Sequence, residues 1–257
     1  MNDLIQPRPS TDFAALGQGV DAMARARGHD TFLEVLRDSR RSLLATAALI
    51  DDLCDSGAAP DAIREATQMA RTLARHVDLC ARAVEQLGGV VTDELVPGRA
   101  IDHGGWPASA RVVRRVIELL CVESTLCAST LAAMRRAARD PIARELLGDM
   151  LLDQRAHTAL GWSWLEREAR HLPCGMRDWV MDWLPELLAD VEARCRPPLS
   201  AVTRVQLEPP CPFGGLSAAE REVSFLRAMH ERILPGLRQA GLDGTAAWSM
   251  RPERDAA

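Results

Sequence analysis

Apolar residues recur along most of this chain at intervals of three and four positions, which is the period of an amphipathic α-helix. Asp30 is the predicted N-cap of the first long helix, and a short helix is expected before it, near residues 12–27. Strand-like alternation occurs only around residues 89–96. The pattern and the helix start and stop signals predict four long helices, at about residues 31–54, 60–88, 108–138 and 141–170.

The second and third long helices are joined by residues 89–107, which show no helical pattern and contain several glycines and prolines. A connection of this length is typical of a crossover and not of a tight hairpin. Four long helices with one long middle connection form the layout of a ferritin-like four-helix bundle. The sequence therefore predicts an all-α fold of this kind.

The chain continues beyond the bundle as a helical extension. A helix near residues 176–195 is expected to be interrupted by Pro185, and the capping box Ser217-Ala-Ala-Glu220 opens a last helix that reaches about Leu234. We therefore divide the chain into a lead-in with a short helix (1–29), a ferritin-like four-helix bundle (30–170) and a C-terminal helical extension that packs on the bundle (171–257).

The composition narrows the classes of function. The chain has 257 residues, 47% of them hydrophobic, which is enough for a sizeable core. All 31 residues of the Lys+Arg count are arginine, and tyrosine is absent, so mechanisms that need a Schiff-base lysine, a P-loop lysine or a catalytic tyrosine are excluded. This bias is typical of a GC-rich bacterial genome. The formal net charge of -5 favours no nucleic-acid partner.

The sequence carries no recognisable targeting signal. The N-terminus lacks the basic and apolar regions of a signal peptide, and no apolar run approaches the roughly 18 residues that span a bilayer. Seven cysteines, scattered and odd in number, favour reduced thiols over a disulfide framework. We therefore expect a cytoplasmic protein without a membrane partner.

Two histidines are predicted to point into the bundle, about midway along the second and fourth long helices. Each lies on an apolar stripe, and a buried histidine is usually satisfied by a buried partner, so a structural role competes with a metal or catalytic role. The first stripe contains Met69, Leu73, His76, Cys80 and Val84, and the second contains Leu146, Met150, Asp153, His157 and Trp164, with Gln154 beside it.

The segments around these histidines resemble bacterial ferritin-like di-iron carboxylate proteins. Ala-Arg-His76-Val-Asp-Leu-Cys80, followed by Gln86-Leu-Gly-Gly89, resembles their second helix, and Cys121-Val-Glu-Ser-Thr125 resembles their third. Leu152-Asp-Gln-Arg-Ala-His157-Thr-Ala-Leu-Gly-Trp162 resembles the fourth-helix pattern Leu-x-Asp-Glu-x-x-His-Ala-x-Leu-Gly-Trp. The resemblance covers about residues 31–170 and implies the fold of that superfamily.

The resemblance also implies a site with one glutamate on each of four helices and a histidine on two of them. Both histidines are present, but the glutamate positions fall on Ser39, Leu73, Ser124 and Gln154. A one-residue shift on the first and third helices would place Asp38 and Glu123 there instead. Leu73 and Gln154 would remain, because each lies three residues before a histidine.

Two iron ions bring about four to six positive charges into a nearly dry bundle, and neutral side chains cannot offset them. We therefore expect a degenerate di-iron site and no cofactor, or at most a single transition-metal ion. The resembling family uses an aspartate, matched here by Asp153, to orient the histidine of the second helix. An Asp153–His76 hydrogen bond is thus expected, and Thr72 is expected to play the same part for His157.

Three functions follow from a bundle with such a site. The first is a repurposed cavity that binds a small molecule. The second is a metal-independent or mononuclear-metal (Cu, Zn or Fe) enzyme of bacterial secondary metabolism, in which His76, His157 and Asp153 act. The third is a non-catalytic scaffold or interaction protein. The residues expected to line the cavity are Ser39, Leu73, Cys80, Cys121, Ser124, Gln154 and Trp162.

Two details bear on these alternatives. A mononuclear site would draw its thiol ligands from Cys80 or Cys121, although buried cysteines are commonly small hydrophobic residues of the core. The tryptophan pair Trp179/Trp183, one helical turn apart, fits either docking of the extension on the bundle or a homodimer contact, and docking is favoured.

Overall fold

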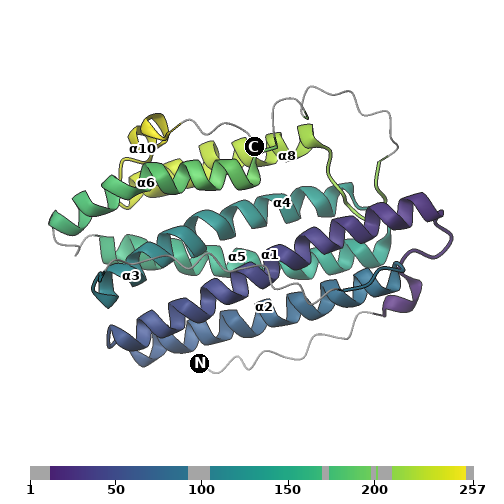
Figure 1. The fold of residues 1–257 in the computed structure, drawn as a ribbon, viewed down its shortest axis with the longest axis horizontal. Coiled ribbons are helices and arrows are strands. Elements are labelled where there is room, and N and C mark those ends of the chain that lie inside the picture. Colours follow the sequence, from purple (N-terminus) through teal and green to yellow (C-terminus); the bar gives the residue numbers. More distant parts are fainter. Residues whose placement is uncertain (1–11, 92–104, 170–173, 198–200, 202–209, 253–257) are drawn as a thin grey trace.

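The computed structural model describes residues 12–91, 105–169, 174–197, 201 and 210–252. Regular structure in these ranges is entirely helical, without a β-strand. Figure 1 shows long helices packed side by side along a common direction, with a further layer of helices along one side. The all-α bundle predicted from the sequence is confirmed, while residues 92–96 of the strand-like segment, like the rest of 92–104, lie outside the described residues.

The first half of the bundle is a helical hairpin. A short 3-10 turn, η1 (Phe13–Ala15), precedes α1 (Ala22–Asp55), which packs along its length against α2 (Pro60–Gln86). Pro60 occupies the first turn of α2, where its missing N–H costs no helical hydrogen bond. The bounds of α2 agree with the predicted second helix.

The second half of the bundle contains a continuous helical run and α5 (Pro141–Ala169). The run consists of α3 (Ala108–Arg115), a π-helical stretch η2 (Val116–Glu123) and α4 (Ser124–Ala137). Helix α5 packs against both η2 and α4. The outer bounds match the predicted third and fourth helices, but the periodicity gave no sign of the π-helical stretch.

The first long helix begins earlier than predicted. Asp21 caps α1, and its side chain accepts a hydrogen bond of 2.7 Å from the first helical turn, so Asp30 lies inside the helix. Gly28 also lies inside, because the ring of Phe213 packs against it: a Cβ there would lie 2.4 Å from the ring. The glycine near the predicted start therefore reflects a close packing contact and not a helix boundary.

The C-terminal extension forms a layer over the bundle (Figure 1). It consists of α6 (Cys174–Cys195), then the run α8 (Ala218–Ala228), η3 (Met229–Ile233) and α9 (Leu234–Gln239), and finally α10 (Gly244–Met250). Helix α8 packs on α4, and α10 packs on α6. The predicted capping box that opens α8 is present.

Pro185 was expected to interrupt its helix, and the last helix was expected to reach only about Leu234, but Pro185 and Pro235 both lie inside helical runs. Pro185 is internal to α6, and Pro235 lies in the first turn of α9, directly after a π-helical stretch. The missing N–H of an internal proline costs about 3 kcal/mol. Burial of Leu184, Leu187 and Leu188 against the bundle offsets this cost for α6.

The apolar core consists of two clusters, one toward each end of the bundle. Along α2, Leu73 belongs to one cluster, and Leu79 and Cys80 belong to the other. His76 lies between them and is only 1% exposed. The core is therefore divided by a band of polar side chains at about the middle of the bundle, which we call the polar layer: Ser39, Thr72, His76, Asp153, Gln154 and His157.

One helical run among the described residues, Ala108–Ala137, is long and apolar enough to cross a membrane by length and composition. Its apolar side chains face α1, α5 and α8, and 56% of its most apolar window is buried inside the protein. We interpret it as the core helix of the bundle.

Candidate functional site

The polar layer is held together by two hydrogen-bonded histidines. The first, His76 on α2, has its Nε2 atom 3.0 Å from Oδ2 of Asp153 on α5. Arg75 donates to the same carboxylate oxygen at 2.6 Å, and its other terminal nitrogen lies 3.8 Å from Asp149. The Asp153–His76 hydrogen bond predicted from the sequence is thus present, with an arginine that the sequence analysis had not included.

The charge state of Asp153 fixes the tautomer of His76. Burial alone would raise the pKa of Asp153, but hydrogen bonds from His76 and Arg75 outweigh burial and lower this pKa to about 2. The carboxylate is therefore ionised and only accepts hydrogen bonds, so Nε2 of His76 carries the proton. In the neutral ring Nδ1 is then the basic nitrogen, and it makes no hydrogen bond to any residue that the structure describes.

The second histidine, His157 on α5, uses both ring nitrogens. Its Nδ1 lies 2.8 Å from Oε1 of Gln154, and its Nε2 lies 2.8 Å from the hydroxyl of Thr72, as predicted for that threonine. Burial lowers the pKa of His157 to about 4, and the neighbouring His76 acts in the same direction. At neutral pH the ring is therefore uncharged, and Nδ1–H donates to Oε1 of Gln154. The single proton of the Thr72 hydroxyl is shared between Nε2 of His157 and the carbonyl oxygen of Met69, which lies 2.9 Å away.

A cavity of about 340 Å³ opens beside the polar layer. Its deepest polar residues are Ser39, His76 and Gln154, which are 6%, 1% and 4% exposed. Apolar walls surround them, and the wall residues come from α1, α4, α5 and α8. These are Val35, Leu126, Leu131, Met134, Met150 and Phe225.

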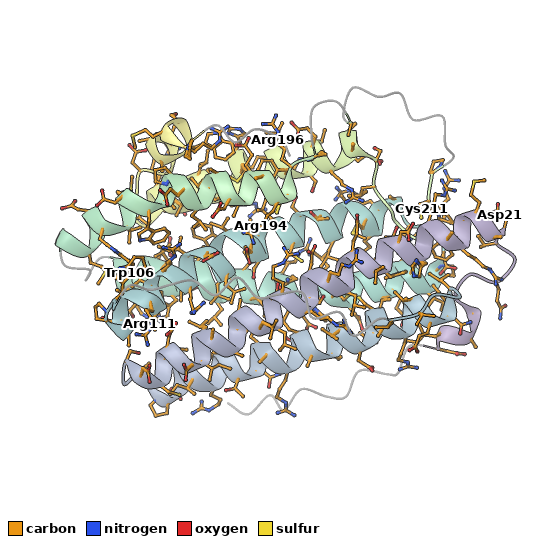
Figure 2. All side chains as sticks on the ribbon, viewed as in Figure 1. Asp21, Trp106, Arg111, Arg194, Arg196 and Cys211 are labelled. Atoms are coloured by element: carbon orange, nitrogen blue, oxygen red, sulfur yellow. The ribbon has the colours of Figure 1, made fainter. Side chains whose placement is uncertain are left out.

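The charged side chains that line this cavity are more exposed than its polar residues Ser39, His76 and Gln154. Asp38 and Arg41 form an ion pair of 2.9 Å on α1, and Arg194 of α6 forms one of 2.7 Å with Glu123 of η2. Arg221 of α8 completes the rim, and Figure 2 shows Arg194 between the bundle and the outer layer. The cavity is thus neutral inside and has paired charges at its mouth.

Three residues expected on the cavity lie elsewhere. Leu73 belongs to an apolar cluster, Cys80 lies in the opposite cluster with its Sγ 3.8 Å from Sδ of Met150, and Cys121 is fully buried within η2. Each is enclosed by core side chains, so none faces the cavity. Trp162 also does not line it, because its indole points to another groove, between α4, α5 and α9.

The π-helical stretch explains the error at Ser124. The backbone N–H of Ser124 donates to the carbonyl oxygen of Leu119, five residues earlier, which is the hydrogen bond of a π-helical turn, and the Ser124 hydroxyl donates to the same oxygen at 2.9 Å. One extra residue in the turn rotates the following positions around the axis, so Glu123 and not Ser124 lines the cavity. On α1, Asp38 and Ser39 both line the cavity. Each of the two residues that a one-residue shift of register would bring to the site, Asp38 and Glu123, therefore lines the cavity.

The sequence analysis also missed part of the cavity wall. Arg194 and Cys195 from α6, with Arg221 and Phe225 from α8, close one side of it. Both helices belong to the extension, and no motif relates them to the bundle. The amphipathic pattern of α8 was the one available signal, and it could not specify which face of the bundle α8 would cover.

The described residues contain no group of three or more His, Cys, Asp or Glu side chains arranged to hold a metal ion. Burial raises the pKa of the Cys80 and Cys121 thiols, and that of Cys127 to about 12. A thiol nucleophile requires the thiolate form, which a raised pKa disfavours. These cysteines therefore pack as small apolar side chains.

Comparison with known proteins identifies the fold. A solved structure described as protein 19 with aldehyde deformylating oxidase activity, from Synechococcus, superimposes with a TM-score of 0.55 over 92% of this chain and 96% of that chain, at 17% sequence identity. No known protein-family profile matches this chain, and no curated protein matches its sequence. The chain has the ferritin-like helical-bundle fold, as the sequence predicted.

Proposed function

We propose that this protein is a ferritin-like bundle that lacks a conventional di-iron centre and whose cavity beside the polar layer binds a small molecule. The observation that carries the proposal is the arrangement around His76: a neutral cavity of about 340 Å³ whose innermost polar groups are a fixed imidazole, an amide and a hydroxyl.

The donors of the polar layer do not fit two iron ions. Leu73 is a core residue, and Gln154 offers an amide oxygen that already bonds to His157. His157 has both nitrogens engaged, and Nε2 of His76 is bound to Asp153. A di-iron centre needs several carboxylates to offset its charge. Glu123 and Asp38, the carboxylates that line the cavity, are each paired with an arginine.

The cavity has the properties of a ligand pocket instead. Its volume lies near the lower end of the range of about 300–1,000 Å³ that ligand pockets occupy. Apolar walls with a few convergent polar groups favour a compact, mainly apolar ligand that carries one or two hydrogen-bonding groups. Because the interior is neutral, a charged ligand group would have to remain at the rim, near Arg194 or Arg221.

A second function is favoured by the tautomer of His76. With Nε2–H held by Asp153, Nδ1 is the nitrogen that can take a proton from a molecule in the cavity. Asp153 would orient the ring and stabilise its protonated form, as a carboxylate does for a catalytic histidine. This supports a metal-independent proton-transfer enzyme built on the same cavity.

Metal analysis of protein purified from iron-supplemented cells tests the first part of the proposal. We expect well below one iron per chain, while a value close to two irons per chain, the content of a di-iron centre, would overturn it.

Fragment screening by thermal shift and ligand-observed NMR tests the cavity. Compounds that raise the melting temperature of the natural protein should lose this effect in Ser39→Phe, which fills the cavity, or in Thr130→Phe on the rim if the first variant does not fold. Thr67→Phe on the exposed surface of α2 is the control and should keep the effect. Equal binding to the filled and natural proteins would contradict the proposal.

The enzymatic alternative is tested with the same compounds. Those with an acidic C–H bond are incubated in deuterated water, and exchange at that carbon is followed by NMR. Exchange catalysed by the natural protein and lost in His76→Phe supports a general base. If every such compound binds without exchange, the function is limited to ligand binding. If no compound binds or exchanges and His76→Phe lowers only the stability of the protein, the result points to a scaffold role.

A further inference from the structure

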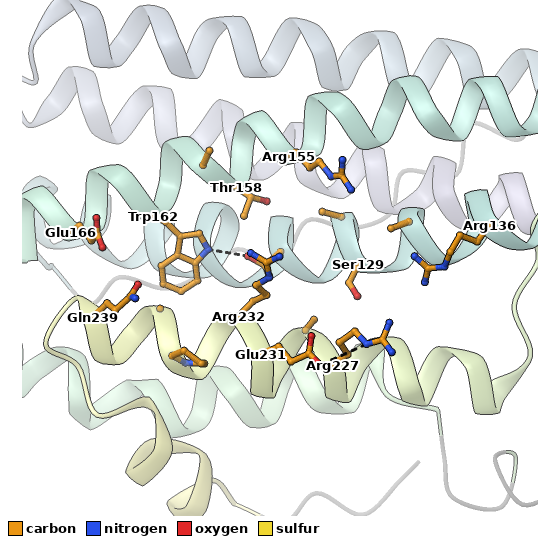
Figure 3. Close-up of a pocket in the computed structure, with 17 residues that line it drawn as sticks. Ser129, Arg136, Arg155, Thr158, Trp162, Glu166, Arg227, Glu231, Arg232 and Gln239 are labelled. Carbon is orange, nitrogen blue, oxygen red and sulfur yellow. Dashed lines mark hydrogen bonds and ion pairs between the residues drawn. The ribbon is translucent and has the colours of Figure 1, made fainter.

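A second hollow lies on the opposite face of α4 from the cavity. It is a groove of about 740 Å³, bordered by α4, α5 and the run from α8 to α9. Figure 3 shows three rows of side chains, one from each helix, along its length. We call it the arginine groove, because four arginines line it: Arg136, Arg155, Arg227 and Arg232.

The charge of this groove is opposite to that of the chain. Four arginines and two glutamates, Glu166 and Glu231, give its lining a formal charge of +2, while the whole chain carries -5. The chain contains arginine and no lysine, so the presence of arginine instead of lysine in the groove does not by itself indicate an anion site. The gathering of four of them from three separate helices is the informative feature.

Most of these guanidinium groups lack an internal partner. Arg227 lies 3.8 Å from Glu231, one turn along the same helix. Arg136, Arg155 and Arg232 form no ion pair or hydrogen bond with any residue that the structure describes. The groove therefore keeps three guanidinium groups available for an anion, and guanidinium groups match the geometry of phosphate and carboxylate.

Three of the four arginines lie toward one end of the groove. In Figure 3, Arg136 and Arg227 lie at that end and Arg155 follows them, while Arg232 lies in the middle, beside Trp162, and Glu231 lies beside Arg227. The opposite end holds Glu166 and Gln239. An elongated anion would therefore bind in one direction, with its charged group toward the arginines.

The floor between the two ends is made of small and mostly apolar residues. It is formed by residues without long side chains: Ala128, Ser129, Ala132, Ala159, Pro235 and Gly236. Trp162 closes it, because its indole N–H donates to the Thr125 hydroxyl at 3.1 Å and its ring packs against Gly236. A Cβ on Gly236 would lie 2.7 Å from the indole, so the glycine permits this contact.

We propose that the arginine groove is a second ligand site, which binds an elongated organic anion with its phosphate or carboxylate among Arg136, Arg155, Arg227 and Arg232 and its apolar part along the alanine floor toward Trp162. The site is distinct from the cavity beside the polar layer, because the two are lined by different residues on opposite faces of α4. It does not depend on the fate of the metal site or on the chemistry of His76.

Calorimetric titration with n-octyl phosphate at low ionic strength tests the proposal, with inorganic phosphate, n-octanoate and n-octanol as comparison probes. We expect one octyl phosphate per chain, weaker binding of inorganic phosphate and no saturable binding of octanol. Tighter binding of octyl phosphate than octanoate assigns the head-group position to a phosphate, and the reverse order assigns it to a carboxylate. Failure of both anions to bind overturns the proposal.

Variants locate the binding. Arg155→Gln combined with Arg232→Gln should weaken binding by about tenfold or more, since each charged hydrogen bond lost is worth about 1.5–3 kcal/mol. Ala159→Trp should also weaken it by filling the groove without changing its charge. Arg238→Gln is the matched control, because Arg238 is an exposed arginine of α9 outside the groove, and it should bind as the natural protein does.

Two further outcomes would overturn the proposal. One is binding that survives the double arginine variant but is lost in Ser39→Phe, which would place the probe in the cavity. The other is binding of polyglutamate without binding of octyl phosphate or octanoate, which would make the groove a docking surface for an acidic polypeptide.

Discussion

The Nε2 atom of His76 lies 3.0 Å from Oδ2 of Asp153, and this contact joins α2 to α5 in the middle of the bundle. It satisfies two polar groups that would be costly to bury alone. It also selects one of the two neutral forms of the imidazole, the form in which Nδ1 is basic. The same pair thus links α2 to α5 and leaves Nδ1 as the basic nitrogen of a histidine that lines the cavity.

Asp153→Asn should lower the free energy of unfolding by about 1–3 kcal/mol, because the charge that orients His76 and holds Arg75 is lost. It should also change the tautomer of His76, because a neutral amide no longer requires Nε2 to be protonated. Urea denaturation measures the first effect, and the ¹⁵N chemical shifts of the ring measure the second.

Asp149→Asn is the matched control for this variant. Asp149 lies one turn from Asp153 on α5, and one of its carboxylate oxygens lies 3.8 Å from Arg75. Its loss should cost less than about 1 kcal/mol, as for a partly exposed ion pair, and should leave the His76 tautomer unchanged. Equal effects of the two substitutions would contradict the role assigned to Asp153.

The stability of the protein should fall as the pH drops from about 6.5 toward 4, because of His157. The folded pKa of about 4 lies below the usual value of 6.5, so the unfolded chain binds a proton more readily in this range. The stabilising contribution of His157 to the free energy of unfolding is fully present above pH 6.5. Below pH 4 it is lost, and this loss amounts to up to about 3 kcal/mol. Urea denaturation across this pH range measures it.

His157→Gln provides the comparison for the pH series. It removes the titrating group but keeps an amide that can bond with its neighbours, so the slope between pH 6.5 and 4 should flatten. Asp153 acts in a lower window: its lowered pKa contributes stability that is lost as the pH falls from about 4 to 2. An unchanged slope in His157→Gln would show that another group carries the dependence.

The two histidine contacts could be predicted from the sequence because helical periodicity turns both histidines inward and the family resemblance implies their partners. His76 and His157 lie on apolar stripes of long helices, so both had to face the interior. The partners Asp153 and Thr72 occupy positions that the resembling family uses to orient its histidines. The structure contains both contacts, at 3.0 and 2.8 Å.

The register of the third helix could not be predicted, because a π-helical turn leaves little trace in the apolar pattern. The extra residue in η2 moves Ser124 toward Leu119 and brings Glu123 to the cavity. The start of α1 was wrong for a related reason: Gly28 is required by a ring of Phe213, which is distant in sequence. Contacts of this kind depend on tertiary packing, which a local pattern does not contain.

Neither the cavity nor the arginine groove could be predicted without knowing where the C-terminal extension packs on the bundle. Arg194 and Arg221 close the cavity, and Arg227 and Arg232 line the groove, yet all four come from α6 or from the run η3 and α8. The sequence identified these helices as an appendage that packs on the bundle. Only the fold shows that they form walls of both candidate sites.

Thr72→Val should lower the free energy of unfolding by about 1–3 kcal/mol, because it leaves Nε2 of His157 buried without its 2.8 Å partner. Thr67→Val is the control, since Thr67 lies on the same helix but is exposed, and its hydroxyl bonds only to the backbone of Ile63. That change should alter stability by less than about 0.5 kcal/mol. A cost as large for Thr67 as for Thr72 would mean that loss of the hydroxyl acts through the helix and not through His157.

Gly161→Ala should destabilise the protein by about 1–3 kcal/mol, because α5 and η2 meet at this glycine without room for a side chain. A Cβ there would lie 2.4 Å from Cβ of Leu120 and 2.8 Å from its carbonyl carbon, and a backbone atom cannot move aside as a flexible side chain can. The two helices would have to separate, which should also loosen the nearby Trp162–Thr125 hydrogen bond.

Gly175→Ala is the matched control on α6, where a Cβ would meet no atom within 4 Å. There alanine should leave stability unchanged or raise it by about 0.5–1 kcal/mol, because glycine is the poorer helix former. Thermal and urea unfolding of the two variants compare these effects directly. If Gly161→Ala were as stable as Gly175→Ala, the close approach of α5 to η2 at Gly161 would be wrong.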